Sequence, residues 1–276
     1  MPALPSESAA ALKHPGFWLP VATLWWRELV RFYRQRSRVV GVLGTPLLFW
    51  LLIGSGFGKS FRPPDFSGSA GITYLEYFFP GTILLVVLFT SIFSNMSLIE
   101  DRREGFLLSV LVAPISRTAL AFGKILGGCT LALLQGLLIL LLAPAVGLRL
   151  GFRQAAEVTA ILFLISFALT ALGFYFAWRV DSVQGFHGVM NLVLMPMWLL
   201  SGALFPFSGA HPWVEWVMRV NPLTYGLAAL RRVLYPATPA DIPSLSASIG
   251  ATVVFGLLVA LAGLRQARQP STGGSV

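Results

Sequence analysis

Residues 77–99, YFFPGTILLVVLFTSIFSNMSLI, form a run without Asp, Glu, Lys or Arg. A helix needs about 20 apolar residues to cross the hydrocarbon core of a bilayer, so this run predicts a transmembrane helix. Five further charge-free intervals have similar lengths, and a helix satisfies its own backbone hydrogen bonds in lipid. The sequence therefore predicts an all-α polytopic membrane domain over residues 39–264, with six transmembrane helices at 39–58, 77–99, 125–148, 158–178, 183–205 and 242–264.

The composition agrees with this class. Of the 276 residues, 56% are hydrophobic and 11% charged, against about 25% charged residues in soluble domains. The only cysteine, Cys129, lies in an apolar run, which excludes a disulfide framework and a cysteine-based metal site. The formal net charge of +9 is assigned to segments that face anionic lipid headgroups, and we expect no nucleic-acid partner.

The distribution of Lys and Arg predicts the orientation. An even number of spans puts both termini on one side, and that side then carries thirteen basic residues against seven on the other. The positive-inside rule places both termini in the cytoplasm. Residues 1–16 form a polar tail without the features of a signal peptide, and residues 265–276 form a cytoplasmic tail.

Residues 17–38 are predicted to form an amphipathic helix that lies on the membrane. Arginines recur at intervals of four, three and four, while aromatic and aliphatic residues follow the same period on another stripe. Tryptophan and arginine both suit the headgroup level. The alternative is a cytoplasmic helix packed on another protein. The expected membrane anchors are Trp18, Trp25, Trp26, Arg27, Arg31, Arg34 and Arg38.

A cytoplasmic loop follows the second span. A tight charge cluster precedes an apolar stretch that stops at a proline, which predicts a short surface helix with one apolar face. We expect a partner protein to cover this face; the alternative is a helix resting on lipid. The candidate partner-binding residues are Glu100, Asp101, Arg102, Arg103, Glu104, Gly105, Phe106, Leu107, Val110, Leu111 and Pro114.

The segment between the fifth and sixth spans, roughly 206–241, contains two short helical patterns, each opened by a proline. Both are too short to span and too apolar for a solvated loop, so we expect them to form a re-entrant external lid. A proline and a Ser-Gly pair predict a kink in the span below. The candidate residues of this region are Pro196, Ser201, Gly202, Phe205, Pro206, Asn221, Pro222 and Tyr225.

Motifs for catalysis are absent from the sequence. The stretch 54–60, GSGFGKS, is close to a phosphate-binding loop, but Ile53 occupies the position of the first glycine. The stretch also follows a membrane helix rather than a strand. Because this loop motif is incomplete, we expect no ATPase activity in this chain. The three histidines are scattered, so we also expect no metal site, and we expect no cofactor.

Polar groups within the predicted spans are few. The spans contain no Asp, Glu, Lys or Arg, which argues against a proton-coupled carrier. Asn95, Gln135 and Asn191 are the strongest polar groups, and we expect them to form hydrogen bonds between helices rather than to bind substrate.

The arrangement resembles the ABC type-2 permeases, which are the membrane subunits of bacterial ABC exporters. Within this family it resembles the permeases that export drugs and lipo-oligosaccharides. Three groups of residues carry the resemblance: Glu100–Gly105 with Val112–Arg117 and Gly123-Lys124; Pro196 with Ser201-Gly202 and Phe205-Pro206; and Asn221–Tyr225 with Arg231. The resemblance extends over nearly the whole chain.

The resemblance implies a half-transporter in the bacterial inner membrane. Two copies, or this chain and a related permease, would assemble with two separate ATPase subunits that bind ATP and Mg²⁺. Residues 100–114 would form the coupling helix, and the external helices with the fifth span would gate the export path. The implied substrate is a hydrophobic or amphipathic drug, lipid or lipid-linked glycan. The alternatives are a membrane scaffold that transports nothing, and a secondary carrier or channel.

Overall fold

The computed structural model describes residues 16–57, 72–113, 115–208, 210–235, 238 and 241–268, apart from the side chains of Leu108 and Leu111. Most of the two predicted tails, Gly58 and Pro114 lie outside the described residues. Within the described part of the chain the regular structure is entirely helical.

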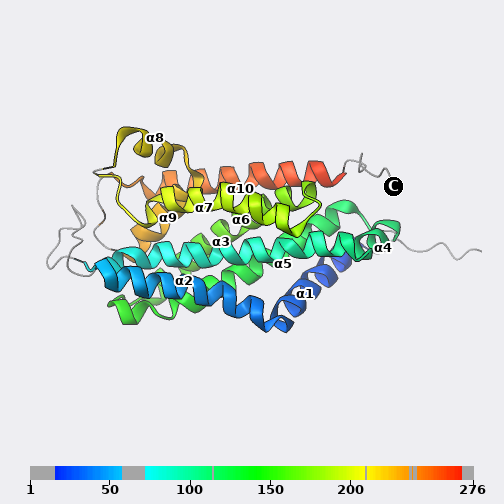
Figure 1. Ribbon diagram of the computed structural model, residues 1–276, viewed down its shortest axis with the longest axis horizontal. Helices are drawn as coiled ribbons and strands as arrows, with labels where there is room; N and C mark the ends of the chain where they lie inside the picture. The colour runs from blue at the N-terminus through cyan, green and yellow to red at the C-terminus, as the bar shows by residue number, and fades with distance from the viewer. Residues whose placement is uncertain are drawn as a thin grey trace, which may run out of the picture.

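Six of the helices are long and apolar enough to cross a membrane. Figure 1 shows them side by side along the long axis of the molecule. They are α2 (Arg36–Phe57), α3 (Tyr74–Arg103), α5 (Arg117–Leu140), α6 (Phe152–Arg179), α7 with the π-helical turn that follows it (Val183–Ala203), and α10 (Leu245–Arg268). The prediction of six long apolar helices is therefore confirmed.

The remaining helices lie at the two ends of the bundle (Figure 1). One end, called the α4 end below, carries α1 (Trp18–Arg34), α4 (Phe106–Val112) and the last residues of α10. The other, called the α8 end, carries α8 (Pro212–Val220) and α9 (Pro222–Leu234). The first described residues and the last therefore lie at the same end.

The third long helix is displaced from the predicted range of 125–148. It begins at Arg117, where the Ser116 side chain accepts a hydrogen bond from the Ala119 amide and caps the helix. It ends at Leu140 and is followed by a 3₁₀ turn, Ala143–Val146. Charges mark span boundaries only where they are exposed, and the interval rule failed here because Lys124 is buried within the helix.

The second long helix also extends past its predicted end. It continues to Arg103, so Glu100 and Asp101 belong to its last turns rather than to a loop. Only Glu104 and Gly105 separate it from α4, and Gly105 has a positive φ of 76°. This left-handed residue, which favours glycine, turns the chain into α4.

The central helix of the bundle is α3, which is buried along most of its length and packs against α2, α5, α6 and α7. Small residues allow the close approach: a Cβ added to Gly128 of α5 would lie 2.5 Å from Ser94 Oγ of α3. Asn95 donates to the Thr170 carbonyl of α6 at 3.1 Å, as predicted for a bond between helices. The buried amide of Gln135 has no partner among the described residues, so it does not show the predicted bond; Asn191 is exposed, and the prediction for it stays a prediction.

Candidate functional site

The amphipathic segment is two helices rather than one. The first, α1, ends at Arg34, and Gln35 leaves the helical conformation with φ −92° and ψ 78°, so that Arg38 belongs to α2. Trp18 and Trp26 are exposed, whereas Trp25 donates from Nε1 to Thr130 Oγ1 at 3.0 Å. Only part of the predicted set of anchors therefore faces outward.

Buried opposite charges lie where α1 meets α3 and α5. Lys124 of α5 donates from Nζ to Glu28 Oε1 at 2.6 Å and to Asp101 Oδ2 at 2.5 Å. All three residues are almost completely buried. The Ser97 hydroxyl of α3 accepts from Lys124 at 3.1 Å and donates to Glu28 Oε2 at 2.6 Å. Burying charges is costly unless they are paired and hydrogen-bonded, and this arrangement meets both conditions.

Three arginines of the predicted lipid-facing stripe extend this group. Arg27 makes a bidentate contact with Asp101, at 2.9 and 2.7 Å, and Arg31 binds Asp101 at 2.5 Å and Glu100 at 2.9 Å. Arg38 donates to Glu100 at 2.9 Å. The hydrogen bond to Asp101 raises the pKa of Arg27 above its ordinary value. We call the set the charge cluster: Arg27, Glu28, Arg31, Arg38, Glu100, Asp101 and Lys124.

The charge cluster ties four helices together at the α4 end. Its members come from α1, α2, α3 and α5, and their formal charges nearly cancel, with four cations and three carboxylates. Because the carboxylates of Glu28 and Asp101 are shielded from water, these pairs are screened much less than surface pairs. A displacement of the last turn of α3 therefore acts directly on the other three helices.

The short helix α4 joins the cluster through Phe106. The guanidinium carbon of Arg27 lies over the Phe106 ring, 3.8 Å from its centre. Leu107 and Val110 are buried within the same chain, so the expectation that this apolar face needs a partner is wrong for them. Packing against the end of α3 covers these residues, and Val112 is exposed instead.

The other predicted coupling residues have different surroundings. Arg102 donates to Asp181 at 2.9 Å and to the Trp178 carbonyl at 2.8 Å, which ties α3 to the turn between α6 and α7. Arg103 and Glu104 are exposed. The Leu111 side chain and Pro114 lie outside the described residues. The predicted set is thus divided between a buried, charged part and an exposed part.

At the α8 end, the regular α-helical part of α7 ends at Trp198, two residues after Pro196. The chain passes through a π-helical turn, Leu199–Ala203, in which Leu200 and Gly202 depart from helical dihedral angles. Gly202 has a φ of 89°. The prediction of a kink at Pro196 and Ser201-Gly202 is consistent with this geometry. We call the stretch from Met197 to Leu204 the α7 break.

Side chains from other helices satisfy the carbonyl groups of the α7 break. Asn221 donates to the carbonyls of Met197 at 2.6 Å and Leu200 at 3.0 Å, while its own Oδ1 caps α9 by accepting from the Leu223 amide. From α3, the Tyr77 hydroxyl donates to the Gly202 carbonyl and the Tyr74 hydroxyl to the Leu204 carbonyl, each at 2.9 Å.

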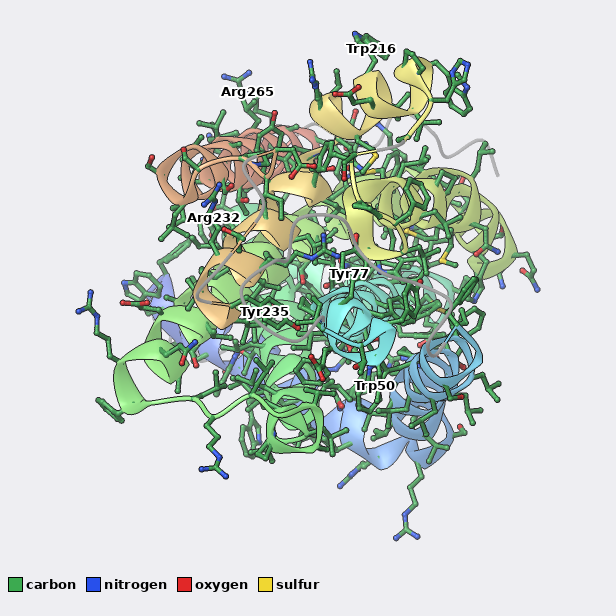
Figure 2. The ribbon with its side chains drawn as sticks, turned by 90° about the vertical axis from the view of Figure 1, so that its left-hand side faces the viewer. Trp50, Tyr77, Trp216, Arg232, Tyr235 and Arg265 are labelled. Atoms are coloured by element: carbon green, nitrogen blue, oxygen red, sulfur yellow. The ribbon has the colours of Figure 1, made fainter. Side chains whose placement is uncertain are left out.

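Figure 2, which looks onto the α8 end, shows Tyr77 near the middle of the bundle and Trp216 of α8 at its edge. The two predicted lid helices differ accordingly. The second, α9, is packed into the bundle with Leu223, Leu227 and Leu230 buried, whereas α8 exposes Trp213 and Trp216. Only α8 has the peripheral position expected of a lid.

The other predicted residues of this region surround the α7 break without binding it. Phe205 and Pro206 follow it and are partly buried, and Pro222 occupies the first turn of α9. The Tyr225 hydroxyl donates to the Arg219 carbonyl of α8 at 2.7 Å, so it joins the two short helices.

Sequence reasoning missed Glu28, Tyr74 and Tyr77, and it used Lys124 only as part of the family resemblance and not as a site residue. A signal existed for Glu28, because it lies four residues from both Leu24 and Phe32 on the buried face of α1. A carboxylate within an apolar stripe indicates a buried cation elsewhere in the chain. Among the described residues, no group of three or more His, Cys, Asp or Glu side chains is placed to hold a metal ion.

Comparison with known proteins gives the same family as the resemblance. The model of the ABC-2 type transporter family matches residues 20–235. A putative transport permease, ycf38, from Cyanophora paradoxa is 26% identical over 246 residues, which cover 86% of this chain and 83% of that protein.

Two bacterial relatives are similarly distant. The inner membrane transport permease YadH of Escherichia coli K12 is 24% identical over 244 residues, covering 87% of this chain and 91% of YadH. The daunorubicin resistance ABC transporter permease protein DrrB1 of Streptomyces coeruleorubidus is 23% identical over 216 residues, covering 76% and 73%. The family model matches most of the chain, and the fold supplies six apolar helices, so this protein belongs to the ABC-2 type transporter family as a membrane permease subunit.

Proposed function

We propose that this permease is one half of an ATP-driven exporter. Two copies, or this chain and a related permease, assemble with two separate ATPase subunits, which bind ATP and Mg²⁺ and supply the energy. The substrate is a hydrophobic or amphipathic compound, taken from the cytoplasm or the inner leaflet of the bacterial inner membrane. The relative named for daunorubicin resistance supports export of this chemical class.

The observation that carries the proposal is the contact between Phe106 and Arg27, because it joins α4 to the charge cluster. In the proposed orientation the α4 end faces the cytoplasm, where an ATPase would bind. The ATPase contacts the exposed side of this region, at Arg103, Glu104 and Val112. Its closure displaces α4, and Arg27 and Asp101 pass the displacement to α1 and α3.

At the opposite end, the α7 break serves as the external gate. The carbonyl groups of Gly202 and Met197 are held by the side chains of Tyr77 from α3 and of Asn221, the cap of α9. A change of shape in the gate therefore does not require regular helical hydrogen bonds to break at these carbonyls. Exposed Trp18, Trp26 and Arg34 of α1 suit the inner headgroup layer, and exposed Trp213 and Trp216 of α8 suit the outer one.

Affinity purification from membranes in mild detergent, with mass spectrometry and an ATPase assay on the eluate, tests the partnership. We expect a co-purifying ATPase with a Walker motif. The variant Val112→Glu should abolish co-purification while the permease still reaches the membrane. The matched control is Val220→Glu, at an exposed valine of α8 at the opposite end of the bundle, which should leave the complex intact.

A second experiment separates coupling from binding. In Asp101→Asn the ATPase should still co-purify, but substrate export should be lost because the cluster no longer transmits its movement. A permease that is repeatedly isolated without any ATPase, and whose phenotype does not depend on one, would instead indicate a membrane scaffold. Transport driven by an ion gradient in the absence of an ATPase would indicate a secondary carrier.

A further inference from the structure

Arg231 of α9 is a buried cation outside the charge cluster. Its side chain is about 3% exposed, and among the described residues no carboxylate forms an ion pair with it. One terminal nitrogen, Nη2, donates to the Gly202 carbonyl at 2.8 Å and lies 3.5 Å from the Tyr77 carbonyl. The guanidinium carbon lies 4.2 Å from the centre of the Tyr77 ring. Carbonyl dipoles and an aromatic face thus take the place of a counter-ion.

Hydrogen bonding alone does not account for a cation at this position. The Gly202 carbonyl already accepts a bond from the Tyr77 hydroxyl, and its neighbours in the α7 break are satisfied by the neutral side chains of Asn221 and Tyr74. The Nε–H of Arg231 is buried with no partner among the described residues. A charge buried in this way is costly, and in membrane proteins such a group usually has a function.

The position of Arg231 connects three elements that must separate if the gate opens. Its backbone is in α9, its ring contact is on α3, and its hydrogen bond is to the one residue of the α7 break with a positive φ. A Cβ placed on Gly202 would lie 3.7 Å from Arg231 Nη1, which shows how closely the guanidinium sits against this backbone.

We propose that Arg231 is the positioning residue that holds the α7 break closed. The proposal rests on the proposed function of the α7 break as the external gate. With the guanidinium in place, Gly202, Tyr77 and α9 are held together. When the guanidinium withdraws to water at the α8 end, the Gly202 carbonyl keeps only the Tyr77 hydroxyl as a donor, α9 is no longer bound to the α7 break, and the cost of burying the charge is recovered. The contacts of the guanidinium stabilise the closed state, and the burial of its charge destabilises it. The free-energy difference between the closed and open states therefore stays small enough for the gate to open.

The test measures how often the α7 break opens. Ser201 is 1% exposed and next to Gly202, so Ser201→Cys in a Cys129→Ala background gives a single buried thiol. In proteoliposomes of the purified permease, a membrane-impermeant sulfonated maleimide should label this thiol slowly. Arg231→Gln should raise the labelling rate by at least about tenfold, the factor that corresponds to one lost charge-assisted hydrogen bond.

Two controls separate gating from general loosening. Arg232 is the matched variant, because it also binds carbonyl groups, those of Ile242 and Pro243, but does not contact the α7 break. Arg232→Gln should leave the labelling rate of Ser201→Cys unchanged. The native Cys129, buried in α5, reports on the core, and in Arg231→Gln with Ser201 intact it should remain unreactive toward N-ethylmaleimide.

An unchanged rate at position 201 in Arg231→Gln would overturn the proposal, as would a parallel rise at Cys129. If Arg231→Gln does not reach the membrane, Arg231→Lys replaces it. Lysine keeps the charge but not the planar contact with Tyr77, so faster labelling supports the proposal and unchanged labelling overturns it. No ATPase or substrate is needed, so this result is independent of the pull-down that tests the exporter assignment.

Discussion

Lys124 and Glu28 form an ion pair across 96 positions of the chain, with 2.6 Å between Nζ and Oε1. Each side chain is 3% exposed. The pair joins the non-spanning helix α1 to the long helix α5, and it lies beside Asp101, the carboxylate that also receives Arg27 and Arg31.

Removing Lys124 should leave the Glu28 carboxylate with a single ionic contact, 3.4 Å from Arg27. We expect Lys124→Met to destabilise the permease by about 3 to 5 kcal/mol, the usual cost of an uncompensated buried charge. The double variant Glu28→Gln/Lys124→Met should cost at least about 1 kcal/mol less than the sum of its single variants. Thermal unfolding in detergent measures these differences.

The exposed pair Arg153–Glu157 supplies the control for this cycle. Arg153→Met should change stability by less than about 1 kcal/mol, because solvent screens the pair. Strict additivity in the Glu28–Lys124 cycle would show that the two residues do not stabilise one another.

Arg27→Lys should loosen α4 without unfolding the bundle. Lysine retains the charge but loses the bidentate contact with Asp101 and the planar contact with the Phe106 ring. Hydrogen–deuterium exchange should therefore become faster in the peptide that covers residues 106–112. Arg34→Lys, at an exposed position of the same helix, should leave this exchange unchanged, and equal acceleration in both variants would argue against the contact.

Asn221→Ala should cost more than the loss of an ordinary helix cap. Asn221 caps α9 and also satisfies the carbonyls of Met197 and Leu200, whereas Ser182 only caps α7 by accepting from the Gly185 amide. Removing a cap costs about 1 kcal/mol, and each stranded buried carbonyl adds about 1 kcal/mol or more. The decrease in melting temperature should be clearly larger for Asn221→Ala than for Ser182→Ala; equal decreases would contradict this role of Asn221.

Gly128→Ala should be strongly destabilising, because its new Cβ would lie 2.5 Å from Ser94 Oγ and 2.6 Å from Thr170 Cγ2. Such overpacking costs about 1 to 3 kcal/mol. A Cβ at Gly188 of α7 meets nothing within 4 Å, so Gly188→Ala should be neutral or stabilising. Melting temperatures of the two variants provide the comparison, and a stable Gly128→Ala would mean that α3, α5 and α6 can separate there at little cost.

The sequence predicted the helices but not the contacts between their charged residues. Apolar runs such as residues 77–99 determine which segments form long helices, because the bilayer requires them. The predicted start of α5 was wrong because Lys124 was taken to mark the end of a span. Lys124 is instead buried against Glu28 and Asp101, and these partners are too distant in the sequence to be recognised from it. Local periodicity likewise showed the arginine stripe of α1 but not which side of it faces protein.

The region of the α7 break was easier to locate than to explain. Pro196 and Gly202 indicate a distortion by their own backbone chemistry, and Asn221 before Pro222 predicts the start of α9. The donors that satisfy the freed carbonyls, Tyr74 and Tyr77, follow from tertiary packing. Arg231 was recognisable within a family motif, but its burial could not be inferred from a helix that also carries the partly buried Arg232.

The convergence of Arg27, Arg31 and Lys124 on Asp101 has a consequence for genetics. Loss of one cation leaves the Asp101 carboxylate with two partners, whereas loss of this carboxylate leaves the charge cluster with four cations and only two carboxylates, Glu28 and Glu100. Suppressors of an Asp101→Asn defect should therefore arise by removal of a cation, and more readily at Arg27 or Arg31 of α1 than at Lys124, which still pairs with the buried Glu28. The charge balance of the charge cluster, rather than any one of its pairs, would then be what selection acts on.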